Sequence, residues 1–532
     1  MYTNTYFDTR GLCTEPLTFT QAIVKGIAPG GGLFVPQVVP RLALDEILGL
    51  AALPYAQQAA FIYERFGVDL PVEKIGQLMA TAYGDNFDTP EVAPVVEVAP
   101  NTHVLELWHG PTSAFKDMAL QCLPPFFSAS IDQLRGQEGV RQGDVRQGNT
   151  SPDASQAQKD YLILVATSGD TGKAALEGFR DRDHTGIVVF YPQGGVSDIQ
   201  WRQMATQRGT NVGVFGVEGN FDSCQTAVKG AFSDEAFNKM LAREHGLLLS
   251  SANSINWGRL LPQIVYYVSA YARLVQSGAL APGDELDVCV PTGNFGNILA
   301  CWYAKDMGVP VGRLLCASNE NRVLADFINT GTYDIRARAF VLTPSPSMDI
   351  LVSSNLERQL FELSGRDPEA IRGWMESLRT QQRFQVDRDT FAALRHDFAA
   401  SWVSSDDSLA TIKEVYDAHG YLLDPHTAVG WKVAERLRGE NPVLIAATAH
   451  WAKFGADVYR ALTGLPANSA LPAPAQSLTG LELNALIAEK YGTGPSSLPA
   501  RLAELGDLPI RFEDICGNTA ASVEDAVISW LK

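Results

Sequence analysis

Lys116 stands in a short segment whose residue types suit covalent chemistry on a lysine amine. The segment, residues 107–117, reads LWHGPTSAFKD, with Phe115 before the lysine and Met118 two positions after it. The electropositive start of a helix disfavours a charged ammonium, and the neutral amine is the form that Schiff-base chemistry needs. An isolated Lys-Asp pair is more commonly a solvated surface group. By itself, this segment leaves both interpretations open.

Two further segments have the composition of anion-binding turns. Residues 166–173, ATSGDTGK, place hydroxyls and backbone N–H groups at a predicted helix start, where carboxylates and phosphates bind. Residues 291–297, PTGNFGN, precede another predicted helix, and Gly293 and Gly296 permit a tight turn with close approach to an anion. Neither matches a dinucleotide or P-loop pattern. An ordinary helix cap, at Ser168 or Asp170, and a turn without a ligand remain the alternatives.

Two less specific segments complete the set. Residues 251–259, SANSINWGR, end in Arg259, whose guanidinium can hold a phosphate through two hydrogen bonds. Residues 446–454, AATAHWAKF, contain Thr448, whose hydroxyl can donate to or accept from a ring nitrogen. A structural arginine and a capped strand end are the alternatives here.

The elements that position these segments alternate between strand and helix from about residue 95. Apolar runs of strand type, separated by helical stretches, read THVLELWH, YLILVATSG, GIVVFYP, NVGVFGV and DELDVCVPTG. Such alternation predicts a parallel α/β sheet flanked by helices. In these sheets ligands bind in the loops at the carboxyl ends of the strands, where the segments above lie.

The chain is long enough for two or three domains. Apolar residues at helical spacing in LALDEILGLAAL and VEKIGQLMATAYG predict a mainly helical accessory domain over residues 1–95. We expect a catalytic domain of two α/β subdomains over 96–465, with a polar surface insertion at about 129–159. Residues 466–532 are expected to form a linker and a closing segment that ends in the helix VEDAVISWL.

Composition excludes several classes of protein. Lys plus Arg number 42 and Asp plus Glu 60, a formal charge of −18, which disfavours a nucleic-acid partner. Seven scattered cysteines without a CxxC indicate neither a disulfide framework nor a metal site. No apolar stretch reaches the ~20 residues of a membrane span, and the start has no signal-peptide pattern. Cytoplasmic residence is therefore expected.

Five motifs in this order, HGPTSAFKD, TSGDTG, NSINWGR, PTGNFGN and ATAHWAKF, resemble threonine synthases of the longer bacterial and fungal form. The early YFDTRG and FTQAIVKGIAPGGGLFVP stretches also look like the start of that family. The resemblance implies a fold-type-II enzyme, related to tryptophan synthase β, that uses pyridoxal 5′-phosphate (PLP). It implies conversion of the small molecule O-phosphohomoserine to threonine, and it leaves a monomer or a homodimer open.

The resemblance also implies roles for individual residues. Lys116 would carry PLP as a Schiff base and act as the catalytic base, and Asp170 would lie beside the 3′-oxygen of the cofactor. The cofactor phosphate would be held by Gly293, Asn294, Phe295, Gly296 and Asn297, and Thr448 would face the pyridine nitrogen. Ser168 and Thr171 would hold the substrate carboxylate, and Asn253, Ser254, Arg259 and Asn294 the substrate phosphate.

Two positions differ from common patterns. Asp170 stands where many relatives of this fold have Asn, although long threonine synthases carry Asp there, and Trp451 stands where the family usually has Pro. Two alternatives to threonine synthesis remain: a PLP-dependent lyase acting on another phosphorylated amino acid, and a catalytically silent binding protein of the same fold. Lys116 and the glycine-containing loop argue against the silent protein.

Overall fold

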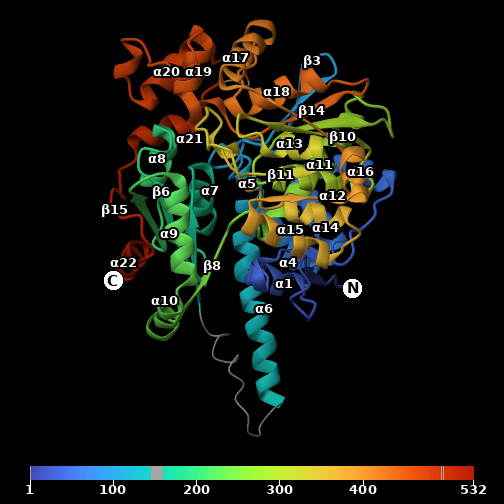
Figure 1. Cartoon of the computed structure of the whole chain (residues 1–532), viewed down its shortest axis with the longest axis vertical. Coiled ribbons are helices and arrows are strands. Elements are labelled where there is room, and N and C mark those ends of the chain that lie inside the picture. The colour runs from blue at the N-terminus through green and yellow to red at the C-terminus, as the bar shows by residue number, and fades with distance from the viewer. Residues whose placement is uncertain (1, 145–159, 493, 495–496) are drawn as a thin grey trace.

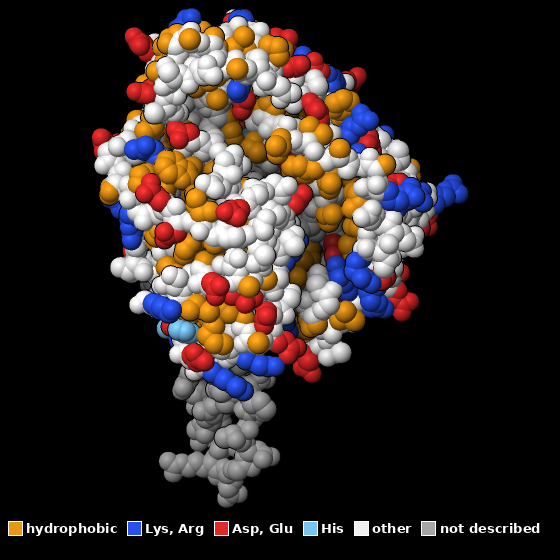
Figure 2. Space-filling view, turned by 60° about the vertical axis from the view of Figure 1, so that its left-hand side comes forward, with side chains coloured by type: hydrophobic (Ala, Val, Ile, Leu, Met, Phe, Trp, Pro, Cys, Tyr) orange, Lys and Arg blue, Asp and Glu red, His pale blue; other side chains and the backbone are white. Residues whose placement is uncertain are grey.

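A computed structural model describes residues 2–144, 160–492, 494 and 497–532 of the chain. Its described part contains two largely parallel sheets with helices packed on their faces, which confirms the expected α/β class (Figure 1). Among the described residues no helix is both long and apolar enough to cross a membrane. Acidic and basic side chains are interspersed on the face that Figure 2 shows.

The larger sheet has six strands in the order β13-β10-β9-β14-β4-β3. Neighbouring strands are parallel except β3, which runs antiparallel to β4. Every residue of β4, β9 and β14 is buried, as expected for parallel strands covered on both faces. The strands are β3 (Val95–Ala99), β4 (Thr102–Glu106), β9 (Leu286–Pro291), β10 (Val311–Ser318), β13 (Phe398–Trp402) and β14 (Val443–Ala447).

Helices cover both faces of this sheet. Val288 and Leu444 belong to one core cluster and Cys289 and Ile445 to another, because successive strand side chains point to opposite faces. Helix α12 (Gly296–Met307) packs against the first face and α18 (Pro425–Leu437) against the second. Beside α12 runs α11 (Trp257–Gln276), which is buried along almost its whole length.

The smaller sheet has five parallel strands in the order β15-β7-β6-β5-β8. Its strands are β5 (Asp160–Ala166), β6 (Thr185–Pro192), β7 (Val212–Val217), β8 (Leu247–Ser250) and β15 (Ile515–Cys516). Helix α7 (Asp170–Phe179) packs against β6, and α9 (Phe221–Ser233) packs against β5 and β6. The predicted last helix is confirmed as α22 (Ala520–Leu531), which packs on α9, so the C-terminal residues complete the smaller sheet.

The N-terminal residues combine helices with one small antiparallel sheet, β1 (Tyr6–Asp8) and β2 (Phe34–Pro36). Both segments with helical spacing do form helices, at α2 (Leu44–Gly49) and α4 (Val72–Ala82). This region also contains α1 (Phe19–Lys25) and α3 (Tyr55–Arg65). Its apolar side chains share one core with α11, so the region packs directly onto the larger sheet's helical layer.

The segment that begins at Lys116 forms two helices, α5 (Lys116–Leu120) and α6 (Leu123–Asp144). The expected surface insertion at 129–159 is wrong at its start, because Ser130 and Ile131 are buried within α6. Ser130 can be buried since its hydroxyl donates to the Phe126 carbonyl at 2.7 Å. Residues 145–159 lie outside the described part of the chain. In Figure 1, α6 extends well beyond the body of the molecule.

The other elements mainly surround the two sheets. They are α8 (Asp198–Ala205), α10 (Glu235–Met240), α13 (Val323–Thr330), α14 (Leu356–Leu363), α15 (Pro368–Gln381), α16 (Arg388–Asp397), α17 (Ser405–His419), α19 (Gly455–Thr463), α20 (Gly480–Tyr491), α21 (Ala500–Ala503), β11 (Thr332–Asp334) and β12 (Arg383–Gln385).

Candidate active site

Three neighbouring parallel strands, β9, β14 and β4, end at the same edge of the larger sheet. The loops that follow them contain PTGNFGN, ATAHWAKF and HGPTSAFKD. Two of these loops are hydrogen-bonded together: the Phe115 N–H donates to the Thr448 carbonyl at 2.8 Å, and the His450 N–H donates to the Ser113 carbonyl at 3.1 Å. The sheet topology therefore places Lys116 beside Thr448 and the glycine-containing loop.

The smaller sheet supplies the facing loops, after β5 and β8. Together the loops of both sheets line a cavity of about 320 Å³. Nearly all residues predicted from the sequence line it: Lys116, Ser168, Thr171, Asn253, Ser254, Arg259, Gly293, Asn294, Phe295, Gly296, Asn297 and Thr448. Asp170 does not line the cavity; its carboxylate lies just behind, 3.4 Å from the hydroxyl of the lining residue Ser347.

Lys116 is the first residue of α5, and its amine donates to the Ser347 hydroxyl at 3.2 Å. Burial lowers the pKa of Lys116 to about 8, with smaller contributions from the positive charges of Arg259 and Lys453. Asp170 opposes this shift. The sequence predicted that the start of a helix would favour the neutral form of the Lys116 amine. In the structure, the main cause of its lowered pKa is burial. The result is an amine that loses its proton near neutral pH.

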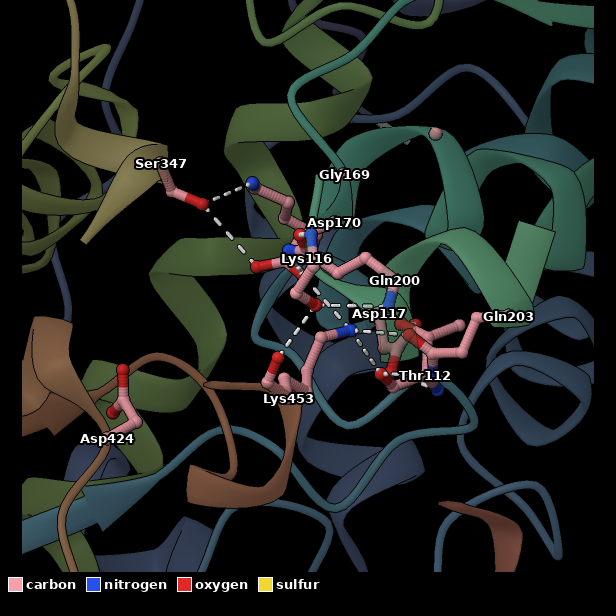
Figure 3. Close-up of polar contacts among 12 residues, drawn as sticks. Thr112, Lys116, Asp117, Gly169, Asp170, Gln200, Gln203, Ser347, Asp424 and Lys453 are labelled. Carbon is pink, nitrogen blue, oxygen red and sulfur yellow. Dashed lines mark hydrogen bonds and ion pairs between the residues drawn. The ribbon is translucent and has the colours of Figure 1, made fainter. Parts of the chain in front are cut away.

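Asp170 forms a buried ion pair with Lys453, whose amine lies 3.0 Å from the carboxylate (Figure 3). The same carboxylate accepts from the Gln200 amide at 2.9 Å. Although burial alone would raise the pKa of Asp170, Lys453 and Lys116 hold it well below its usual range. Lys453 also donates to the Thr112 carbonyl and the Gln203 side chain, so its ammonium is fully engaged. Asp170 is thus a fixed negative charge beneath Lys116.

The start of α7 is capped by Thr167, not by Ser168 or Asp170. The Thr167 hydroxyl accepts from the N–H groups of Gly169 and Gly172 at 2.9 and 2.8 Å. Gly169 has a φ of 130°, and a Cβ there would lie 2.4 Å from the Gln200 side chain, so only glycine fits. Because Thr167 does the capping, the hydroxyls of Ser168 and Thr171 remain available to the cavity.

The turn before α12 is set by its neighbours as well as by its glycines. A Cβ on Gly293 would lie 2.6 Å from the Ser347 carbonyl, so Gly293 makes room for the chain at residue 347. Phe295 has a left-handed φ of 63°. The first helical hydrogen bond runs from the Leu299 N–H to the Phe295 carbonyl at 3.0 Å, which leaves the preceding N–H groups at the helix start without intrahelical acceptors. These donors suit an anion.

Two buried donors on the cavity wall have no partner among the described residues: Asn297 Nδ2 and Arg259 Nε. Both Tyr266 and Tyr267 donate to Asn297 Oδ1 at 2.6 Å, which orients its amide. Arg259 Nη1 donates to the Ala252 carbonyl at 2.6 Å, and burial lowers the pKa of Arg259 to about 10. Unpartnered buried donors call for acceptor oxygens. The donor set therefore fits the oxygens of anionic groups such as phosphates.

Several residues of the site were not predicted. Ser347 and His426 line the cavity, and the Ser347 N–H donates to His426 Nε2 at 3.2 Å. His426 Nδ1 lies 2.8 Å from the Asp424 carboxylate. No motif flagged these residues; Lys453 lay within ATAHWAKF but received no role. Among the described residues no His, Cys, Asp or Glu cluster suited to a metal ion is found.

Family models match both ends of the chain: "Threonine synthase N terminus" over residues 5–83 and "Threonine synthase, C-terminal" over residues 427–527. The chain is 44% identical over 453 residues to Threonine synthase-like 1 of Homo sapiens, covering 84% of this chain. The chain spans only 58% of the length of that relative. Threonine synthase of Pseudomonas aeruginosa is 38% identical, over 88% of this chain and 92% of that protein.

Solved structures of threonine synthases share the fold over nearly the whole chain. The PLP-bound enzyme from Brucella melitensis has a TM-score of 0.82 at 36% identity, covering 99% of this chain and 100% of that one. The yeast enzyme has a TM-score of 0.82 at 32% identity, covering 99% and 98%. These likenesses confirm the expected fold-type-II architecture. By sequence and by structure, the chain belongs to the threonine synthase family.

Proposed function

We propose that the chain is a PLP-dependent threonine synthase, which converts O-phospho-L-homoserine and water to L-threonine and phosphate. The observation that carries the proposal is that a buried lysine and two sets of anion donors line one cavity. Lys116, with its pKa lowered to about 8, lies on one wall. The start of α12 and the buried Arg259 supply the donors. Two phosphates, one on the cofactor and one on the substrate, would use both sets.

PLP, once the substrate amine has replaced Lys116 on it, would supply an electron sink that makes the substrate's Cα and Cβ protons acidic and would leave the Lys116 amine free. Gly293, Asn294, Phe295, Gly296 and Asn297 would hold its phosphate, through the N–H groups at the start of α12 and the Asn297 amide. Thr448 would face the ring nitrogen as a neutral partner. Asp170 would lie beside the 3′-oxygen, where its negative charge is balanced by Lys453.

Lys116 moves the protons. Its amine takes the proton from Cα, and the same group is the candidate base for the proton that leaves Cβ, since these carbons are adjacent. Phosphate then leaves Cγ. Water adds at Cβ, and protons returned to the carbon chain give threonine. An amine with a pKa near 8 can both accept and return a proton at neutral pH.

The substrate would be oriented at both ends. Ser168 and Thr171, at the start of α7, would hold its carboxylate with hydroxyl and backbone donors. Asn253, Ser254, Asn294 and Arg259 would hold its phosphate, and the unpartnered Arg259 Nε would stabilise the charge that builds on the departing group.

A second function remains a candidate because some of the relatives at 44% identity are called Threonine synthase-like 1 rather than threonine synthase. A lyase acting on another phosphorylated amino acid would need the same cofactor residues. It would release a keto acid and ammonia with the phosphate. Product analysis separates the two functions.

The test follows phosphate release and threonine formation from O-phosphohomoserine, in the wild type and in Lys116→Ala. We expect equal amounts of both products from the wild type and a rate lower by about 10³-fold or more in the variant, because the proton-transferring group is removed. Lys239→Ala, an exposed lysine on α10, is the control and should react as the wild type does. Phosphate with a keto acid, instead of threonine, would favour the lyase.

The remaining expectations also belong to this proposal. Cytoplasmic residence follows from the family's ordinary biosynthetic setting, and a small-molecule substrate requires no nucleic-acid partner. A monomer and a homodimer both fit a cavity that one chain completes. Light scattering on the purified protein distinguishes them.

A further inference from the structure

One face of α9 opens onto the mouth of the cavity. Phe221, Gln225 and Lys229 line the cavity and are spaced four residues apart, which keeps them on one side of the helix. The opposite side of α9 is buried against the smaller sheet and α22. Lys229 is therefore directed toward the cavity by the same packing that holds α9 in place.

Lys229 is an exposed cation without a counter-charge. Its amine donates to Gln225 Oε1 at 3.2 Å, and among the described residues no carboxylate lies within ion-pair distance of it. By contrast, Lys239 on the neighbouring α10 pairs with Glu235 at 2.9 Å. In a chain with a formal charge of −18, an unpaired lysine at the mouth of a cavity attracts anions.

The other groups of the cavity do not supply enough positive charge to balance a substrate phosphate. A phosphate monoester carries close to two negative charges at neutral pH. Arg259 supplies one positive charge but uses one of its donors on the Ala252 carbonyl. Lys116 is committed to the chemistry. The nearby Ser254 and Ser354 hydroxyls, 3.4 Å apart, can donate hydrogen bonds but carry no charge.

We propose that Lys229 is a specificity-determining residue, which supplies the second positive charge for the substrate phosphate at the mouth of the cavity. This inference rests on the proposed function. Lys229 draws phosphorylated amino acids into the cavity and remains beside the phosphate when it leaves. Unphosphorylated homoserine lacks the charge that Lys229 recognises.

The experiment compares Lys229→Gln and Lys229→Arg with the charge-matched control Lys239→Gln in the PLP-loaded enzyme. We expect Lys229→Gln to lower kcat/KM for O-phosphohomoserine about tenfold at low ionic strength, mainly through KM, and the difference to shrink with added salt. Lys229→Arg should keep the activity within about threefold, because it keeps the charge. Lys239→Gln should leave the activity unchanged.

The readouts separate a charge effect from a folding defect. Equal kcat/KM in the wild type and Lys229→Gln overturns the inference, as does an equal, salt-independent loss of kcat in both Lys229 variants. If the wild type makes no threonine, the proposed function fails, and calorimetric titration of the PLP-loaded protein with inorganic phosphate decides the role of Lys229. Binding weakened about tenfold in Lys229→Gln then supports a phosphate site there, and unchanged binding overturns it.

Discussion

The base and the mouth of the cavity are built in opposite ways. Just behind the base, Asp170 and Lys453 are almost fully buried, pair at 3.0 Å and make further hydrogen bonds with Gln200 and Gln203 of α8. At the mouth, Lys229 is exposed and makes one hydrogen bond, to a neighbour on its own helix. The cavity wall also contains the unpartnered buried donors of Asn297 and Arg259.

This difference indicates that different parts of the cavity have different roles. Charges at the base hold one arrangement around Lys116, because a buried ion pair is costly to break. Donors in the middle are oriented but unpaired, so they are ready for a ligand. The Lys229 ammonium at the mouth can move toward or away from a substrate at little cost in free energy. Positioning, binding and entry are thus assigned to different groups of residues.

The largest effect should come from removing one partner of the buried ion pair between Asp170 and Lys453. Asp170→Asn leaves the Lys453 ammonium buried without its counter-charge, and we expect the free energy of unfolding at pH 7 to fall by about 3 kcal/mol. Since the pKa of Asp170 is depressed in the folded protein, its contribution is present above the unfolded pKa and is lost as the pH falls through the folded pKa. The destabilisation should therefore diminish below about pH 4.

Urea unfolding measures this effect, with two comparisons. The double variant Asp170→Asn, Lys453→Met should recover part of the loss, because no unpaired charge remains. Lys229→Gln, at the mouth, should change the free energy of unfolding by less than about 0.5 kcal/mol. Similar losses in the free energy of unfolding for Asp170→Asn and Lys229→Gln would contradict the contrast between the two regions.

A smaller effect is expected from the middle of the cavity. Asn297→Ala removes an oriented amide that we assign to the cofactor phosphate, and a hydrogen bond to a charged group is worth about 2 kcal/mol. The dissociation constant of PLP should rise about 30-fold. Fluorescence titration of the apoprotein gives this constant. Tyr271→Phe, which removes a hydroxyl on the adjacent helix α11, is the control, and equal weakening in both variants would contradict a role of Asn297 in binding the cofactor phosphate.

The smallest effect concerns pH. With the pKa of Lys116 lowered to about 8, the neutral fraction of its amine rises about tenfold between pH 7 and pH 9 and then levels off. The rate at which the apoprotein takes up PLP should follow this curve. A free lysine derivative serves as the reference, since its rate continues to rise toward about pH 10.5. A protein curve that matched the reference would mean that burial does not tune Lys116.

Much of the site could be predicted because it lies directly after strands. Lys116, Gly293 and Thr448 lie in the loops that follow β4, β9 and β14, and parallel strands bring their carboxyl ends together. The strand-helix alternation and several helices were predicted by periodicity alone. The residue roles and the domain boundaries at 95 and 465 stay predictions.

What could not be predicted depends on contacts between distant segments. Ser347 belongs to a long irregular stretch and reaches Lys116 only through the fold, a separation of 231 residues. Lys453 lay in a recognised motif, yet its partner Asp170 comes from the other sheet. The buried start of the supposed insertion was missed because polar composition does not reveal that the Ser130 hydroxyl is satisfied within its own helix.

The most direct test of the account identifies the lysine that carries the cofactor. The PLP-loaded protein is reduced with borohydride and digested, and the modified peptide is located by mass spectrometry. The account predicts a pyridoxyl group on Lys116 and none on Lys453, which is also buried but is engaged with Asp170. Modification of Lys453 or Lys173, or of no lysine, would contradict it.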